Sequence, residues 1–141
     1  MPAPFVFVDT SAWYALADTS DAHHEAATQY INTLTTPLVT STYILDETMT
    51  LLRIHLGHGV ACRFGEKLRQ EQIALLLRIT EPDEQRAWDI FVRYDDKVFS
   101  FTDCTSFALM ERLHIETAFA FDEDFRQYGR FVVLPPLSRQ T

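Results

Sequence analysis

PFVFVDTSAWYALAD, residues 4–18, contains the pattern from which the rest of the predicted architecture follows. Its first five residues are β-rich and almost wholly apolar, which is typical of a strand buried at the centre of a parallel sheet. Asp9, Thr10 and Ser11 come next and favour the start of a helix, here predicted over AWYALAD. A buried strand that leads directly into a helix is the first half of a β–α–β unit, so this segment predicts an α/β fold.

The remainder of the chain continues this alternation of short apolar runs and helical patterns. The order favours a central, mostly parallel sheet flanked by helices on both faces, a three-layer Rossmann-like α/β fold. The length of 141 residues suits a single domain, which we place at 1–134 with a C-terminal tail at 135–141. Further strands are predicted at 38–40, 73–79, 117–121 and 131–134, and further helices at 21–34, 42–56, 60–69, 80–94 and 102–114.

Composition excludes several classes of protein. Hydrophobic residues make up 47% and charged residues 23%, which excludes wholesale disorder. No apolar run approaches the roughly 20 residues that a membrane-spanning helix needs, and the first residues lack the pattern of a signal peptide. Cys62 and Cys104 stand alone in the sequence and form no metal-type pair or disulfide framework. We therefore expect a cytoplasmic protein with no membrane attachment.

The charge is uneven along the chain. The net charge is -8, from 12 basic and 20 acidic residues, which is a poor profile for a protein that coats nucleic acid. Residues 1–52 contain six acids and no Lys or Arg, and ten of the 12 bases in the remainder are Arg. Arg suits the binding of phosphate or carboxylate, but genome composition explains this bias equally well.

Three acids follow predicted β-rich segments. Asp9 directly follows FVFV, Asp122 directly follows TAFAF, and Asp103 lies where VFSF meets a helix. Ligands of open parallel sheets bind beyond the carboxyl ends of the strands, so we expect these acids at one edge of the sheet. Helix capping explains each of them when it is taken singly, because Asp is favoured at helix starts.

Glu47 has no such explanation, since it lies inside a predicted helix. It shares a stripe with Tyr43, Ile44, Leu51 and Ile54, so we expect it on an inward face. A buried carboxylate costs several kcal/mol unless an Arg or a cation compensates it. Four acids at one rim would repel one another, and Mg²⁺ or Mn²⁺ relieves that repulsion, because both ions prefer oxygen ligands. An all-carboxylate site of this kind indicates phosphoryl chemistry.

Four segments in order, FVFVDTSAWYALAD, TSTYILDETMTLLR, FSFTDCTSFALMERL and TAFAFDEDFRQYG, resemble the motifs of PIN-domain ribonucleases. Among these, they are most similar to the VapC-type toxins of bacterial and archaeal toxin–antitoxin pairs. The resemblance covers about residues 4 to 134. It implies a PIN-like fold, hydrolysis of RNA phosphodiester bonds with Mg²⁺ or Mn²⁺, a homodimer, and inhibition by a cognate antitoxin protein.

The resemblance also implies which residues act. Ser11, with Thr10 beside it, matches the hydroxyl position of the family and would support the first acid, while Asp124 is a secondary metal ligand. Arg126 lies one helical turn after Asp122, so it would either face the same rim and hold phosphate or form an ordinary ion pair with a neighbouring acid. The catalytic and metal-binding quartet falls on Asp9, Glu47, Asp103 and Asp122.

Other functions remain open at this stage. A housekeeping PIN nuclease of RNA processing has the same motifs, and a non-catalytic dimeric RNA-binding or scaffold protein would keep the acids for structure. An aspartyl phosphatase using Asp122 and Asp124 is disfavoured, because too little chain follows them to complete that fold. The sequence does not specify which RNA is cut, the antitoxin, or the number of metal ions.

Overall fold

The structure is a computed structural model that describes residues 3–136. The described part contains five strands and seven helices in the alternating order that the sequence predicts. Their bounds are β1 Ala3–Val8, α1 Thr10–Ala17, α2 His24–Thr33, β2 Leu38–Ser41, α3 Thr42–Leu56, α4 His58–Arg69, β3 Leu75–Leu77, α5 Glu81–Arg93, α6 Phe101–Leu113, β4 Ile115–Phe119, α7 Asp124–Tyr128 and β5 Val132–Leu134. Pro135 and Pro136 follow β5, and the rest of the predicted tail lies outside the described residues.

All five strands pair in parallel in one sheet, in the order β3-β2-β1-β4-β5. β1 lies at the centre, where Phe7 pairs with Val39 of β2 and Val8 with Phe119 of β4. From β1 the chain first builds outward through β2 and β3, and it later returns to build β4 and β5 on the other side. The order therefore changes direction between β1 and β4, which is where ligands bind in sheets of this class.

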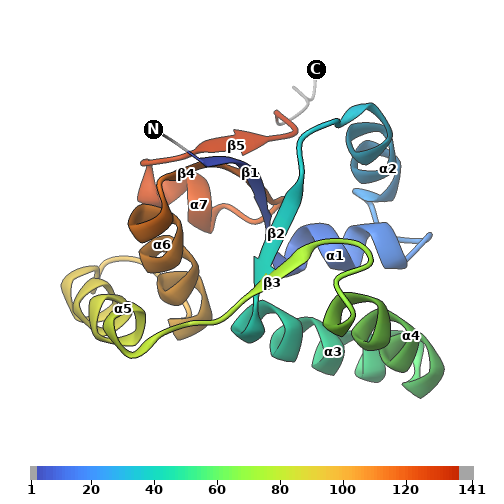
Figure 1. Cartoon of the computed structure of the whole chain (residues 1–141), viewed down its shortest axis with the longest axis horizontal. Coiled ribbons are helices and arrows are strands. Elements are labelled where there is room, and N and C mark those ends of the chain that lie inside the picture. The colour runs from blue at the N-terminus through green and yellow to red at the C-terminus, as the bar shows by residue number, and fades with distance from the viewer. Residues whose placement is uncertain (1–2, 137–141) are drawn as a thin grey trace.

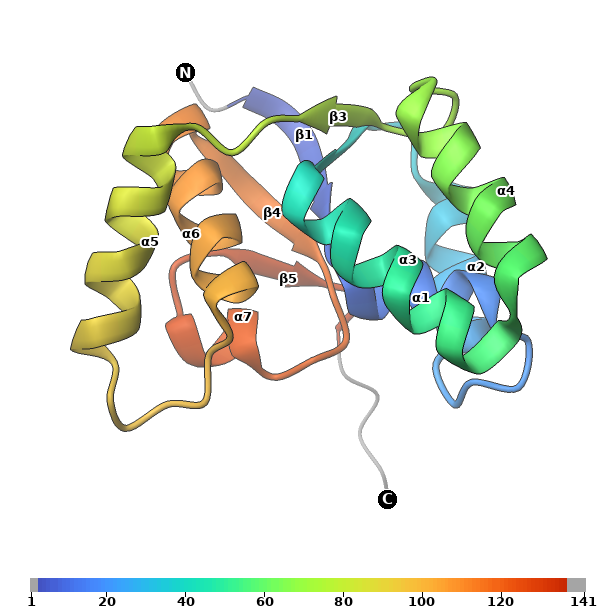
Figure 2. The same ribbon diagram turned by 90° about the horizontal axis from the view of Figure 1, so that it is seen from below.

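Helices cover both faces of the sheet, so the molecule has three layers (Figures 1 and 2). α5, α6 and α7 lie on one side, and α1 to α4 lie on the other. The predicted α/β class and three-layer architecture are confirmed, and the sheet is entirely parallel.

Aromatic rings fill the core on the α6 and α7 side. Phe107 stacks on Tyr128 with ring centroids 4.2 Å apart and meets Phe125 edge-on at 5.0 Å. Phe99, from the loop before α6, packs edge-on against Phe107 at 5.2 Å. All four rings are buried, so they fix α7 and the loop before α6 against the sheet. Of these two segments, α7 carries Asp124 and Arg126, and the loop leads into α6, which carries Asp103.

Several helix ends match the sequence signals. Ser41 caps α3 by accepting a hydrogen bond from the Ile44 amide at 3.1 Å, and Gly57 ends that helix with φ +98°. Thr80 and Asp83 form a reciprocal capping box at the start of α5. Asp83, which is buried, also accepts two hydrogen bonds from the Arg112 guanidinium, at 2.7 and 2.9 Å. This ion pair joins α5 to α6.

Some predicted boundaries are wrong. The second helix begins at His24, because the Asp21 carboxylate accepts a hydrogen bond from the His23 amide in the turn before it. The apolar run 73–79 contains only a three-residue edge strand, which pairs on one side alone. β4 ends at Phe119, earlier than predicted, and residues 98–100 form a loop that buries Phe99 in the aromatic core. No helix within residues 3–136 has the length and apolar character needed to span a membrane.

Candidate active site

The loops after β1 and β4 meet at the point where the strand order changes direction. Asp9 is the first residue after β1, and Asp122 follows β4 after Ala120 and Phe121. The Asp9 amide donates a hydrogen bond to the Phe119 carbonyl at 3.0 Å, which joins the two loops. Asp9 and Asp122 thus lie at the same edge of the sheet.

Asp9 is both a helix cap and a buried acid. Its Oδ2 accepts hydrogen bonds from the amide and the hydroxyl of Ser11, at 3.2 and 2.7 Å, and it is the N-cap of α1. Burial raises the pKa of Asp9 from 3.8 to about 7; the bonds from Ser11 oppose the rise, and the charges of Asp122 and Glu47 add to it. A nearby cation would favour the ionised form of this carboxyl.

The two hydroxyl residues after Asp9 tie α1 to its neighbours. Ser11 Oγ donates to Asp9 and accepts a hydrogen bond from the Phe121 amide at 3.0 Å, so it links the loop after β1 to the loop after β4. Thr10 Oγ1 is buried and accepts a hydrogen bond from Thr48 Oγ1 of α3 at 3.2 Å. Both residues therefore hold the acids in fixed relation to one another.

Glu47 reaches the site from α3, but the predicted inward stripe is only partly right. The buried residues of α3 are Ile44, Thr48 and Leu52, one helical turn apart, and Ile54 is 68% exposed. Glu47 lies beside this row and is half-buried. The predicted stripe is rotated by about one residue from the face of α3 that packs inward. Glu47 therefore lies at the border between the core and the cavity.

Asp103 lies in the first turn of α6, the helix start at which the sequence places it, but residues 98–100 before it form a loop and not a strand. It forms a capping box with Ser100: its Oδ2 accepts from the Ser100 amide at 2.9 Å, and its amide donates to Ser100 Oγ at 3.0 Å. Burial raises the pKa of Asp103, and the negative charges of Asp124 and Asp9 add to the rise. The capping interpretation therefore holds for Asp103, and the same carboxylate also faces the other acids.

Asp122 and Asp124 complete the group from the loop before α7. Desolvation raises the pKa of Asp122, and the negative charge of Asp124 adds to this rise. Desolvation also raises the pKa of Asp124, and the negative charge of Glu123 adds to the rise. The negative charge of Asp124 therefore disfavours ionisation of both Asp122 and Asp103.

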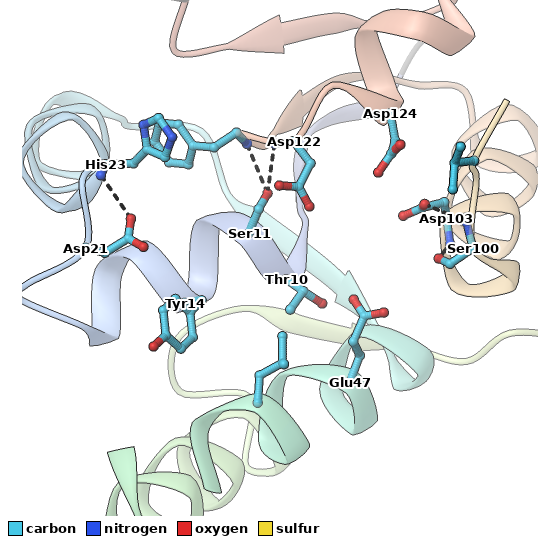
Figure 3. A pocket seen from close by; sticks show the side chains of 13 residues that line it. Thr10, Ser11, Tyr14, Asp21, His23, Glu47, Ser100, Asp103, Asp122 and Asp124 are labelled. Carbon is cyan, nitrogen blue, oxygen red and sulfur yellow. Dashed lines mark hydrogen bonds between the residues drawn. The ribbon is translucent and has the colours of Figure 1, made fainter. Parts of the chain in front are cut away.

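One cavity of about 440 Å³ collects these side chains. Figure 3 shows the carboxylates of Glu47, Asp103, Asp122 and Asp124 pointing into the same space from three different parts of the chain. Asp9 is buried, and it directly precedes Thr10 and Ser11, which line the cavity. The remaining polar or aromatic lining residues are Tyr14, Asp21, His23, Ser100 and Phe121.

The donor set suits a hard divalent cation, because every acidic ligand offers oxygen and the group lacks Cys. Burial raises the pKa values of Asp9, Asp103, Asp122 and Asp124, and neighbouring negative charges add to each rise, so a cation would favour the ionised carboxylates. As the side chains stand, no group of three or more His, Cys, Asp or Glu within residues 3–136 is already arranged to hold an ion. The residues fit Mg²⁺ or Mn²⁺ in chemistry, and binding requires the carboxylates to draw closer together.

Arg126 does not line the cavity, contrary to the interpretation that it faces the rim. Its Nη2 donates a hydrogen bond to the Pro135 carbonyl at 3.1 Å, so the guanidinium faces the segment after β5. Among the described residues it forms no ion pair with Glu123 or Asp122 either. Asp122 lies before α7, so Arg126 is not one helical turn after it, and the short α7 directs this side chain toward the segment after β5.

Sequence reasoning missed the aromatic end of the cavity. His23 and Phe121 lie 98 positions apart in the sequence, yet their rings stack with centroids 4.5 Å apart and an interplanar angle of 11°. No local pattern indicates a contact between a turn residue and a residue after a distant strand. The only available signal was that Phe121 directly precedes Asp122.

Comparison with known proteins places this geometry in a family. A model of the PIN domain matches residues 6–131. The chain belongs to the PIN domain family. It is 38% identical over 130 residues to the 23S rRNA-specific endonuclease VapC20 of Mycobacterium tuberculosis, with 92% of this chain and 98% of that protein covered.

Solved structures of PIN-family relatives agree. The crystal structure of Mycobacterium tuberculosis VapC20, described as a sarcin-ricin loop cleaving toxin, matches with a TM-score of 0.86 at 38% identity and covers 92% of this chain and 99% of that chain. FitAcB from Neisseria gonorrhoeae matches with a TM-score of 0.70 at 14% identity, over 92% and 96% of the two chains, and shows the fold alone. The predicted family is confirmed: the protein is a PIN-domain endoribonuclease of the VapC toxin type.

Proposed function

We propose that this PIN-domain endoribonuclease hydrolyses a phosphodiester bond in the sarcin–ricin loop of 23S ribosomal RNA, with Mg²⁺ or Mn²⁺ held by its acidic cavity. The observation that carries the proposal is the gathering of acids from distant segments at one cavity. It occurs in a chain that is similar over nearly its whole length to an endonuclease named for that RNA. A ribosomal substrate would place the activity in the cytoplasm.

The role proposed for each side chain follows from where it lies in the cavity. Asp9, Glu47, Asp103 and Asp122 would bind the metal ion, with Asp124 as a secondary ligand. A bound divalent ion would supply the positive charge that lets an RNA phosphate approach this negative cavity. The same charge would polarise the phosphate. Ser11 orients Asp9, because its hydroxyl donates to Oδ2 at 2.7 Å. Thr10 holds α1 against α3 beside Glu47.

The experiment is to map cleaved ends. Purified protein is incubated with ribosomes and, separately, with total RNA in Mg²⁺ or Mn²⁺, and new RNA ends are sequenced for the wild type and for Asp9→Asn. We expect a dominant cut in the sarcin–ricin loop that needs metal and is absent from the variant. A dominant cut in another RNA would contradict the substrate, and no metal-dependent cut in any RNA would contradict the activity.

A cognate antitoxin is the second part of the proposal. An apolar groove of about 460 Å³ lies between α1, α2 and α4, and its lining includes Trp13, Leu16, Ile31 and Phe64 together with the basic residues Arg63 and Lys67. Such a groove suits an amphipathic helix that carries acidic residues. Leu16→Glu should abolish antitoxin binding and leave RNA cleavage intact. Growth arrest on expression that a small neighbouring gene relieves would support a toxin over a housekeeping nuclease.

We also propose a homodimer that uses the outer face of α5. Trp88, Phe91 and Val92 are 55%, 43% and 57% exposed and share one side of the helix. Exposed apolar residues gathered on one helix face are typical of interaction surfaces. Analytical ultracentrifugation should show a dimer for the wild type and a monomer for Phe91→Glu. A wild type that stays monomeric at high micromolar concentration would contradict the dimer.

A further inference from the structure

Two stacked aromatic rings form one end of the acidic cavity. His23 stands at the start of α2 and is exposed, and Phe121 follows β4 and is 9% exposed. The imidazole lies nearly parallel to the phenyl ring, with centroids 4.5 Å apart and an interplanar angle of 11°. In Figure 3, His23 stands at the same side of the cavity as Asp21, with Asp122 beyond it.

Phe121, the inner ring of the pair, is linked through its backbone to Asp9. The Phe121 amide donates to Ser11 Oγ at 3.0 Å, and the same hydroxyl donates to Asp9 Oδ2 at 2.7 Å. The Phe121 ring also meets Phe119 edge-on at 5.9 Å. A molecule resting on this stack would therefore lie at a set distance from the acids.

The outer ring is held through its backbone. The His23 amide donates to Asp21 Oδ2 at 2.9 Å, and its carbonyl accepts from the Ala27 amide at 2.9 Å. No hydrogen bond among the described residues involves either ring nitrogen of His23. The next residue differs: His24 Nδ1 lies 2.8 Å from the Ala15 carbonyl, which gives that imidazole a structural contact between α2 and α1. The His23 ring, in contrast, packs on Phe121 and makes no hydrogen bond within the described part of the chain.

We propose that His23, stacked on Phe121, is a binding platform for a nucleobase of the RNA substrate. A base next to the scissile phosphate stacks on the outer face of the imidazole and extends the pair to three layers. Unpaired bases of RNA loops are recognised in this way on aromatic and histidine rings. The inference rests on the proposed function, because it assumes that RNA is cut at the acidic cavity.

The surroundings favour a base over a phosphate at this position. Asp21 and Asp122 line the cavity beside the imidazole, so the local charge is negative and repels a phosphate that no metal ion accompanies. A neutral base pays no such electrostatic penalty and gains contact with a flat ring. His23 would thus position the RNA while the metal ion receives the phosphate.

The test compares substitutions of His23 in steady-state cleavage of an RNA oligonucleotide that spans the mapped cut site. We expect His23→Ala to raise KM about ten-fold with kcat within two-fold, because the base loses the ring on which it stacks. His23→Phe should restore the wild-type KM, because it keeps the platform without charge, and His23→Lys should not. His58→Ala removes an exposed imidazole on α4, which does not line the cavity, and should match the wild type.

The outcomes separate the two proposals. If the wild type cuts the RNA and His23→Ala has an unchanged KM, the platform is wrong and the proposed activity stands. Restoration by Lys and not by Phe would overturn base stacking in favour of a phosphate contact. A loss of kcat with KM unchanged would also overturn it. If the wild type cuts no RNA, both proposals fail together. Melting temperatures of all variants in EDTA verify that each one folds.

Discussion

Replacing Asp9 by Asn should abolish cleavage and, in the absence of metal, make the protein more stable at neutral pH. The fold holds this carboxyl at 3% exposure, in a site where other acids add negative charge. Asn is about as good a helix N-cap as Asp, and its carbonyl oxygen can accept the same two hydrogen bonds from Ser11. The substitution thus removes the buried charge and keeps the local structure.

The magnitude follows from the pKa of Asp9. Its rise from 3.8 to about 7 corresponds to about 4 kcal/mol at pH 7, at about 1.4 kcal/mol for each pH unit. The folded protein holds this proton more tightly than the unfolded chain does. The stability that Asp9 contributes is therefore fully present below about pH 4 and is lost as the pH rises toward 7. The gain from Asn should grow over the same interval.

The assay is urea unfolding of the wild type and Asp9→Asn in EDTA at several values between pH 4 and pH 7.5. We expect a small difference at pH 4 and a gain of about 2 to 4 kcal/mol for the variant at pH 7. Asp46→Asn is the matched control, because Asp46 is an exposed acid beside Glu47, and it should change stability by less than about 0.5 kcal/mol. A variant that is equal to or less stable than the wild type at pH 7 would refute the reasoning from burial.

Four further outcomes are expected. Glu47→Gln should abolish cleavage while the circular dichroism spectrum and melting temperature stay close to wild type; loss of folding would make Glu47 structural. Ser11→Ala should lower kcat by roughly ten-fold or more and unfolding free energy by about 1 to 2 kcal/mol, because Asp9 loses its hydroxyl partner; unchanged kinetics would remove its orienting role. Arg112→Leu should lower the unfolding free energy by about 2 to 4 kcal/mol, since it leaves Asp83 buried without its charge partner, and a neutral effect in urea unfolding would contradict this. Millimolar Mn²⁺ should raise the melting temperature of the wild type by several degrees and that of Asp9→Asn by much less, whereas equal shifts would place the ion elsewhere.

The sequence predicts those parts of the site that depend on local chemistry. Asp9 and Asp122 follow apolar strands, and a carboxylate after a buried parallel strand reaches the ligand-binding edge whatever the details of packing. Asp103 was also placed at a helix start, although the strand expected before it is a loop. These residues are recognisable because strand and capping signals lie within a few positions of them.

The remainder depends on how helices rotate and pack. Helical spacing placed Glu47 on an inward stripe with Ile54, but α3 packs with Ile44, Thr48 and Leu52 inward, and the periodicity of an apolar helix leaves that rotation ambiguous by about one residue. The direction of Arg126 depends on the short α7 and on the carbonyl it meets after β5. Such features are decided by tertiary contacts.

Anomalous scattering from Mn²⁺ in crystals of the wild type would show where the ion binds. The carboxylate cavity predicts one or two strong peaks coordinated by oxygens of Asp9 and of at least two of Glu47, Asp103 and Asp122. The same soak of Asp9→Asn crystals should show these peaks weakened or absent. A strong peak elsewhere with an empty cavity, at Mn²⁺ concentrations that support cleavage, would contradict the assignment of these acids to the metal.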